Sequence, residues 1–459
     1  MLSKNIDHAV VGHNYFAYLF SKILLDRKLS VMLLDDERYN FGDFYTETLT
    51  VLDRELLKRL GKHHQFNGFL EIENYLTRKD HFFYLGKTRV FLGGNALLNY
   101  RELTRKFPSF FQALSPEESE VFEQHFHQYI EETIDFSFDG KKWNSKKPFL
   151  YPANNVFVAS FERFYQKLIG LELSVQEKNL LYTLVNMTRG FYQGVLSSRG
   201  TKAELFHGFI CLISPLYKLD HESLKNQLKD EYIQSGGEFK KLQLNELKFQ
   251  SGSLQSFKLE SFEGHIKAKK MSFLGGASRD LPLELNYRGK IYSCLEGKLI
   301  FTLEGAQKYF THFQDHNILF SSTHKVGTDR PMWFGRFEKD HFNITFIVAQ
   351  KAGSKESFFQ DELTKLINDD FKYVFPEFQG SLAIRDLKFS FDQLIEERSF
   401  QFSQKNVSLI PLNVVRFFKK ERPDFLDPLK NVYYHGPLTN ERLGTFSSLL
   451  VLRSLGPKI

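Results

Sequence analysis

The first forty residues constrain the fold most, because they predict a strand, a helix and a second strand in close succession. Residues 7–11, which end in the apolar run Ala-Val-Val, are typical of a short buried strand. From Tyr15 to Leu25, apolar side chains recur at the spacing of one helix face. Residues 29–34 form a second apolar run. A unit of this order and length favours two parallel strands joined by a right-handed crossover.

The turn after the first predicted strand follows part of the dinucleotide-binding pattern G-x-G-x-x-G/A. Gly12 supplies the first glycine and Ala17 the permitted last residue, with His13 and Tyr15 at variable positions. Asn14 replaces the middle glycine, which normally lets the backbone approach a pyrophosphate. Asparagine is one of the few residues that tolerate a positive φ. We therefore expect these five residues to contact a cofactor.

Two acidic residues end the second predicted strand. Asp35 follows Gly12 by about twenty residues, where a carboxylate that bonds a ribose hydroxyl is expected. Asp36 comes next and belongs to the same predicted site. A carboxylate here repels a 2′-phosphate and favours NAD over NADP, if the cofactor is a nicotinamide. A Rossmann-like unit that has lost its nucleotide remains the alternative.

The segment from Val31 to Asp43 resembles the E-x-R-x-x-x-G-G-R segment of the flavin amine oxidase superfamily. That superfamily includes monoamine oxidases, protoporphyrinogen oxidase, phytoene desaturases, UDP-galactopyranose mutase and the Rab GDP dissociation inhibitors. Gly42 falls on the second glycine of the pair, while Phe41 replaces the first. Asp43 replaces the arginine that usually faces phosphate. The resemblance implies an FAD cofactor with Gly42 beside it.

The middle of the chain is similar to the same superfamily. Asp220 is a good N-cap for a helix that opens within residues 214–224 and ends at Gly236-Gly237. Strands are predicted next, over residues 238–247, 254–259 and 266–273. In the superfamily, the strand after the glycine pair contacts adenine through its backbone. The resemblance assigns that contact to Leu244.

The last thirty residues resemble the closing segment of the superfamily, in which a helix N-terminus faces the flavin and its phosphates. Residues 431–437 predict a short strand that ends in Gly436, and residues 443–450 open a helix. Gly436 and Gly444 match the glycines of that segment, and Thr445 falls on its alanine. Pro437 stands where the superfamily has an aspartate. The resemblance places these four residues at the cofactor.

The resemblance implies an α/β fold, with a Rossmann-type FAD/NAD(P)-binding domain and a mixed α+β substrate domain. The dinucleotide domain is expected to be discontinuous, formed by residues 1–80, 205–280 and 425–459. The substrate or cap domain then comprises residues 81–204 and 281–424. Its first part predicts helices over residues 99–106, 116–136 and 160–171, and its second part predicts strands over residues 298–303 and 341–349.

Composition narrows the class of protein. The 61 basic and 55 acidic side chains leave a net charge of +6, which does not indicate a nucleic-acid partner. Only Cys211 and Cys294 occur, far apart, which favours a reducing compartment and hence the cytoplasm. We recognise neither a signal peptide nor a membrane-spanning segment. The 49 phenylalanines supply either a large core or an apolar ligand cavity.

Other motifs predict little chemistry. His125 and His127 point to different faces of a helix, and no third ligand is evident, so no metal site is expected. The basic run 419–422 favours an exposed loop over a peripheral membrane contact. In the superfamily the flavin itself carries the chemistry. The sequence therefore identifies no catalytic residue and no oligomeric state.

Three functions follow from these observations. The first is an FAD-dependent oxidoreductase of the amine oxidase or desaturase type, acting on an unidentified apolar small molecule. The second is a non-catalytic binding protein on the same scaffold, with an eroded cofactor site as in a GDP dissociation inhibitor. The substitutions at Asn14, Phe41, Asp43 and Pro437 favour this second function. The third is an enzyme that uses NAD. The electron acceptor is not indicated.

Overall fold

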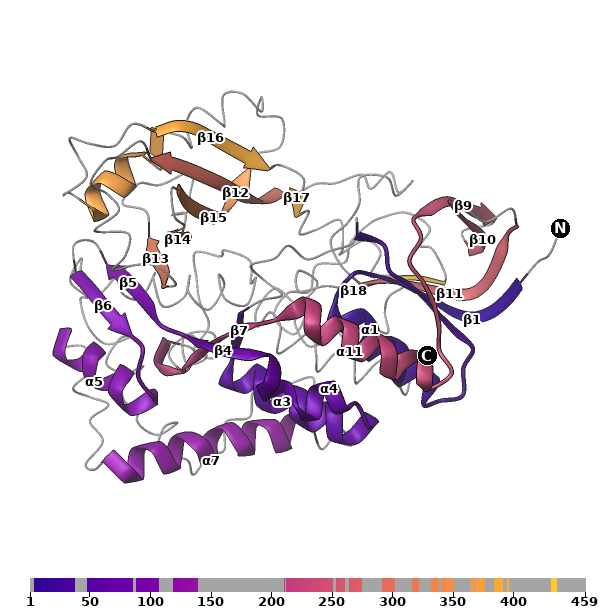
Figure 1. The fold of residues 1–459 in the computed structure, drawn as a ribbon, viewed down its shortest axis with the longest axis horizontal. Coiled ribbons are helices and arrows are strands. Elements are labelled where there is room, and N and C mark those ends of the chain that lie inside the picture. Colours follow the sequence, from indigo (N-terminus) through magenta and orange to yellow (C-terminus); the bar gives the residue numbers. More distant parts are fainter. Residues whose placement is uncertain are drawn as a thin grey trace, which may run out of the picture.

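The structure is a computed structural model of the 459-residue chain (Figure 1). It describes residues 4–37, 48–85, 88–106, 119–138, 210, 212–250, 253–260, 264–274, 291–301, 316–321, 332–337, 341–350, 365–366, 368–375, 384–390, 394–395 and 431–435. Three sheets organise these residues. The predicted helix over residues 160–171 lies outside them.

A parallel sheet of Rossmann type contains the N-terminal unit. Its parallel strands lie in the order β8-β2-β1-β11-β18. In chain order this is 3-2-1-4-5, the order of a dinucleotide-binding fold, which confirms the predicted fold class. The strands are β1 (Lys4–Val11), β2 (Val31–Leu34), β8 (Glu238–Lys240), β11 (Ile266–Leu274) and β18 (Val432–His435).

An antiparallel meander extends one side of this sheet. Strand β9 (Leu244–Gln250) pairs with β10 (Ser253–Leu259), which pairs with β11 through Phe257 and Ile266. The second half of β11 pairs with β18 instead, so β11 changes neighbours along its length. The predicted strand over residues 238–247 is thus two strands, β8 and β9, because the chain leaves the parallel sheet after Lys240.

Two helices pack together beside the parallel strands (Figure 1). Helix α1 (Tyr15–Leu25) begins where the sequence predicts, and all but two of its residues are buried. Helix α11 (His221–Gln234) has Asp220 as its N-cap, as predicted. Its Tyr232 hydroxyl donates to the carbonyl oxygen of Val31 over 3.0 Å, which ties α11 to β2.

A small sheet and a group of helices complete the first half of the chain. Strand β7 (Leu216–Leu219) lies between β3 (Thr48–Thr50) and β4 (Leu76–Lys79) and is antiparallel to both. The sequence did not predict strand β7, which directly precedes the Asp220 cap of α11. The other helices are α3 (Val51–His64), α4 (Asn67–Leu70), the 3-10 turn η2 (Ile72–Tyr75), α5 (Ala96–Lys106) and α7 (Ser119–Phe138).

The third sheet lies away from the parallel one (Figure 1). Its strand order is β16-β12-β15-β14-β13-β5-β6, with β17 also paired to β12. Only the β13–β5 pair is parallel, so this sheet has mixed topology. Its strands are β5 (His81–Leu85), β6 (Thr88–Leu92), β12 (Ile291–Phe301), β13 (Asn317–Ser321), β14 (Met332–Phe337), β15 (His341–Gln350), β16 (Ile384–Ser390) and β17 (Leu394–Ile395).

Candidate functional site

The candidate site lies at the carboxyl edge of the parallel sheet, between β1 and β11. From β1 the chain continues to β2 on one side, whereas β11 and β18 lie on the other side. The strand order therefore reverses between β1 and β11, and ligands of open α/β sheets bind at such a switch point. Gly12 follows β1 directly, and Leu274 is the last residue of β11. We call this edge the switch point.

Gly12 is required by the packing of the switch point. A Cβ atom at this position would lie 2.4 Å from the carbonyl oxygen of Leu274 and 3.1 Å from the Cβ of Ala17. The Gly12 N–H donates to the carbonyl oxygen of Leu34 over 3.0 Å. Gly12 and Ala17 therefore allow α1, β1 and β11 to approach closely, whether or not a ligand binds there.

Asn14 fills the position of the middle glycine with a buried side chain. Its backbone is extended, with φ −153° and ψ 165°, so its tolerance of positive φ is not used. The side-chain Oδ1 accepts from the N–H of Ala17 over 3.2 Å, and Nδ2 donates to the carbonyl oxygen of Leu274 over 2.7 Å. The side chain thus occupies the N-terminus of α1, where an anion would otherwise accept hydrogen bonds.

His13 engages the carboxylate that was expected to bind ribose. Its Nδ1 lies 2.5 Å from Oδ1 of Asp35, and its Nε2 lies 2.9 Å from Nζ of Lys225. An ammonium group can only donate, so Nε2 accepts from Lys225. The ring proton is therefore on Nδ1 and is donated to Asp35. Asp35 is 6% exposed, so its carboxylate is nearly enclosed by protein.

Helix α11 supplies the outer part of this network. Lys225 is 8% exposed at its side chain and also pairs with the exposed Glu222 at 2.9 Å. Partial burial alone raises the pKa of Glu222, but the hydrogen bond and charge of Lys225 lower it overall. Burial lowers the pKa of the adjacent His221 to about 4, and the positive charge of Lys225 adds to this effect. Sequence reasoning missed Lys225, because nothing in a lysine on a predicted helix signals a contact with residue 13.

Three further predicted cofactor residues, Asp36, Leu244 and Tyr15, also take part in contacts within the fold. Asp36 is 1% exposed, and its Oδ2 accepts from the backbone N–H of Leu244 over 3.0 Å. That N–H lies at the start of β9, and the resemblance assigned a contact with adenine to the backbone of this residue. Tyr15 is fully buried and stacks on Phe16 at 4.4 Å between ring centroids, so it belongs to the core.

The residues present at the switch point do not fit an FAD bound in the manner the resemblance implies. At the N-terminus of α1, the Ala17 N–H donates to the Asn14 side chain. The Asp35 carboxylate, which was expected to bind ribose, accepts a hydrogen bond from His13. The remaining predicted cofactor residues, Gly42, Gly436, Pro437, Gly444 and Thr445, lie outside the described part of the chain.

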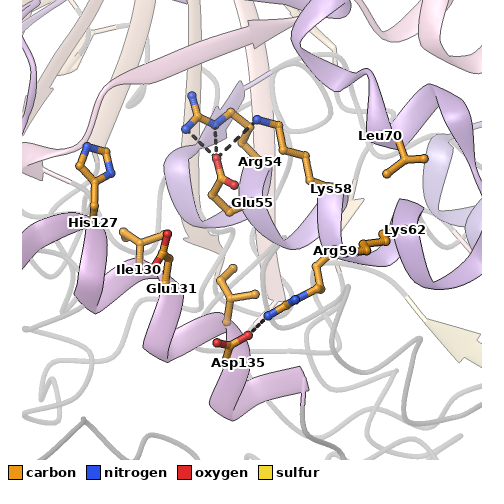
Figure 2. Close-up of a pocket in the computed structure, with 11 residues that line it drawn as sticks. Arg54, Glu55, Lys58, Arg59, Lys62, Leu70, His127, Ile130, Glu131 and Asp135 are labelled. Atoms are coloured by element: carbon orange, nitrogen blue, oxygen red, sulfur yellow. Dashed lines mark hydrogen bonds and ion pairs between the residues drawn. The ribbon is translucent and has the colours of Figure 1, made fainter. Parts of the chain in front are cut away.

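A groove of about 620 Å³ lies between α3 and α7 (Figure 2). Its α3 wall is rich in cations, but most of them pair with nearby carboxylates. Lys58 contacts Glu73 at 2.5 Å, and Arg59 pairs with Asp135 across the groove. The charges therefore largely cancel. The lining residues are Arg54, Glu55, Lys58, Arg59, Lys62, Leu70, His127, Ile130, Glu131, Ile134 and Asp135.

In the described ranges, no group of three or more His, Cys, Asp or Glu side chains is arranged to hold a metal ion. Within the same residues, no helix has both the length and the apolar character needed to cross a bilayer.

No family model matches this sequence, and no curated protein matches it. Solved structures are similar at low identity. Rab GDI from Plasmodium falciparum is 10% identical, with a TM-score of 0.46, over 95% of this chain and 93% of that one. A wild-type putrescine oxidase bound to putrescine is 10% identical, with a TM-score of 0.44, over 100% and 99%. A geranylgeranyl bacteriochlorophyll reductase-like protein from Thermoplasma acidophilum is 8% identical, with a TM-score of 0.42, over 98% and 76%.

Proposed function

We propose that the chain is a non-catalytic binding protein on a Rossmann-type dinucleotide scaffold, and that it works without a flavin at the switch point. The Asn14 side chain carries this proposal. It uses the Ala17 N–H and the Leu274 carbonyl oxygen at the place where a pyrophosphate would bind. Asn14 is fully buried, so a ligand would have to displace it and break both bonds. The expected ligand of this binding protein is still an apolar small molecule, because the 49 phenylalanines could line an apolar cavity.

The His13–Asp35 contact supports the same proposal independently. A ribose hydroxyl would have to replace a histidine that is itself held by Lys225. Breaking such a buried contact leaves charged groups unpaired, which costs about 1–3 kcal/mol or more. Binding energy from the nucleotide would have to exceed this cost in addition to that of moving Asn14.

An FAD-dependent oxidoreductase is the second candidate, and the position of the acidic pair favours it. Asp35 and Asp36 follow β2 at the carboxyl edge, where a dinucleotide-binding fold places its ribose carboxylate. In that case residues 12–17, Asp35, Asp36 and Leu244 would hold the cofactor, and a bound flavin would supply hydride transfer. An NAD-dependent enzyme would use the same residues.

The absorbance spectrum of the purified full chain separates these candidates. We expect no flavin bands, no nucleotide released by denaturant, and no FAD or NAD retained through gel filtration after incubation with an excess. The Asp35→Ala variant is expected to give the same result, because Asp35 holds His13 rather than a ribose. Flavin at about one per chain, lost in Asp35→Ala, would overturn the proposal in favour of the oxidoreductase.

A further inference from the structure

We infer that the switch point retains a binding site for an adenosine diphosphate group, which His13 and Asn14 occupy with their own side chains. This inference rests on the proposed function, because it gives a reason why the switch point would bind no flavin. If the site had been lost altogether, no small change would restore it. If two side chains fill it, their removal should restore nucleotide binding.

The backbone of the site is held in place by contacts that do not involve these two side chains. The Gly12 N–H donates to Leu34, and the Asp35 N–H donates to the carbonyl oxygen of Lys240 over 2.9 Å. Asp36 holds the N–H of Leu244. The turn after β1 and the end of β2 are therefore expected to keep their positions when His13 and Asn14 are shortened.

Each side chain blocks one recognition element of a nucleotide. Asn14 occupies the N-terminus of α1, whose N–H groups and dipole favour phosphate. His13 occupies Oδ1 of Asp35, which is positioned to accept from a ribose hydroxyl. Without the imidazole, the buried Lys225 ammonium loses one of its two partners at 2.9 Å and keeps Glu222, so it has a hydrogen bond to offer a phosphate oxygen.

The test is an isothermal titration of ADP into the wild-type chain and into the His13→Ala/Asn14→Gly double variant. Glycine is an accepted N-cap, so Asn14→Gly keeps a residue suited to the start of α1, although the carbonyl oxygen of Leu274 loses its donor. We expect no saturable binding of ADP to the wild type. For the double variant we expect a dissociation constant at least about tenfold below the weakest binding that the titration can detect. Circular dichroism and a thermal melt establish that each variant is folded.

His64→Ala is the matched control. His64 makes a similar contact, with Nδ1 2.9 Å from Oδ2 of Asp26, but it lies at the end of α3 and Asp26 lies at the end of α1. Removing it deletes a largely buried His–Asp pair away from the switch point, and we expect no ADP binding. Equal ADP binding by this control and the double variant would contradict the inference.

The outcomes separate the inference from the proposed function. ADP or FAD binding by the wild type would refute the proposed function. A folded double variant that stays unable to bind ADP, beside a wild type that also fails, would refute only the inference. If the double variant does not fold, the same criterion applies to Asn14→Gly alone, with a smaller expected gain because Asp35 still holds His13.

Discussion

The side-chain Nδ2 of Asn14 donates a 2.7 Å hydrogen bond to the carbonyl oxygen of Leu274, and this bond joins the N-terminus of α1 to the C-terminus of β11. It crosses the position where strand order reverses in the parallel sheet. The two residues are 260 positions apart in sequence. A bond that stabilises the fold therefore lies where a dinucleotide fold would hold its ligand.

Asn14→Ala is expected to lower the free energy of unfolding by about 2 kcal/mol, because it removes a helix cap and leaves the buried Leu274 carbonyl without this donor. Urea denaturation measures the change. Asn74→Ala is the control: its Nδ2 lies 3.4 Å from Glu71 in an exposed turn, so a change within about 0.5 kcal/mol is expected. Equal losses in the two variants would argue against a structural role for Asn14.

Gly12→Ala is expected to destabilise the chain by about 1–3 kcal/mol, because the new Cβ meets a backbone oxygen that has no rotamer to change. The contact would be 2.4 Å from Leu274 in the unrelaxed structure. Gly68→Ala provides the comparison, since its Cβ would meet only side-chain atoms at 3.2 Å and beyond. Thermal unfolding of both variants measures the difference, and a Gly12→Ala protein as stable as Gly68→Ala would contradict the packing described here.

Asn431→Ala is expected to loosen the junction of β10, β11 and β18, at a cost of about 2 kcal/mol for three lost hydrogen bonds. Asn431 Oδ1 accepts from Leu254 N–H over 2.7 Å, and Nδ2 donates to the carbonyl oxygens of Leu254 and Lys269 over 2.9 Å each. Amide hydrogen exchange of the variant and the wild type measures this loosening directly. We predict that Asn431→Ala speeds exchange in β10 and β18 more than in β1. Unchanged exchange in all three strands would exclude the role assigned to Asn431.

The buried Asp53 makes stability depend on pH. Burial raises its pKa to about 6 from 3.8, although the backbone and side chain of Thr50 donate hydrogen bonds that lower it. The folded state therefore binds this proton more tightly than the unfolded state does. The stabilisation is complete below pH 3.8 and is lost as the pH rises through about 6, by up to roughly 3 kcal/mol.

Denaturation of wild type and Asp53→Asn between about pH 4 and pH 7 tests this dependence. The wild type should lose stability relative to Asp53→Asn as the pH rises. Asp220→Asn is the comparison, because hydrogen bonds from Ser223 lower the pKa of Asp220 and give it a contribution of the opposite sign. Parallel pH profiles for wild type and Asp53→Asn would show that Asp53 does not titrate in this way.

The sequence predicted the parts of the fold that local patterns determine. Helix α1, the Asp220 cap and strands β10 and β11 follow from periodicity and capping residues, and the structure confirms them. Strand β7 was missed, because its residues pair with β3 and β4 from more than a hundred positions away. The proposed domain boundaries stay a prediction.

At the candidate site, too, the sequence predicted the local features and missed the long-range contacts. Gly12, Ala17 and Asp35 occur where the fingerprint places them, at the carboxyl edge of the sheet. The fingerprint describes only neighbouring residues in the sequence. It therefore did not predict the hydrogen bonds of Asn14 with Leu274 and of His13 with Lys225. These contacts use polar groups that the sequence had assigned to a cofactor.

The histidine side-chain NMR spectrum of the ¹⁵N-labelled chain tests this central claim most directly, with His13→Ala to assign the His13 signals. We predict a neutral His13 imidazole with its proton on Nδ1, donated to Asp35, and a spectrum that does not change when excess FAD is added. A His13 ring protonated at Nε2, or His13 signals that shift with FAD in proportion to its binding, would contradict the account.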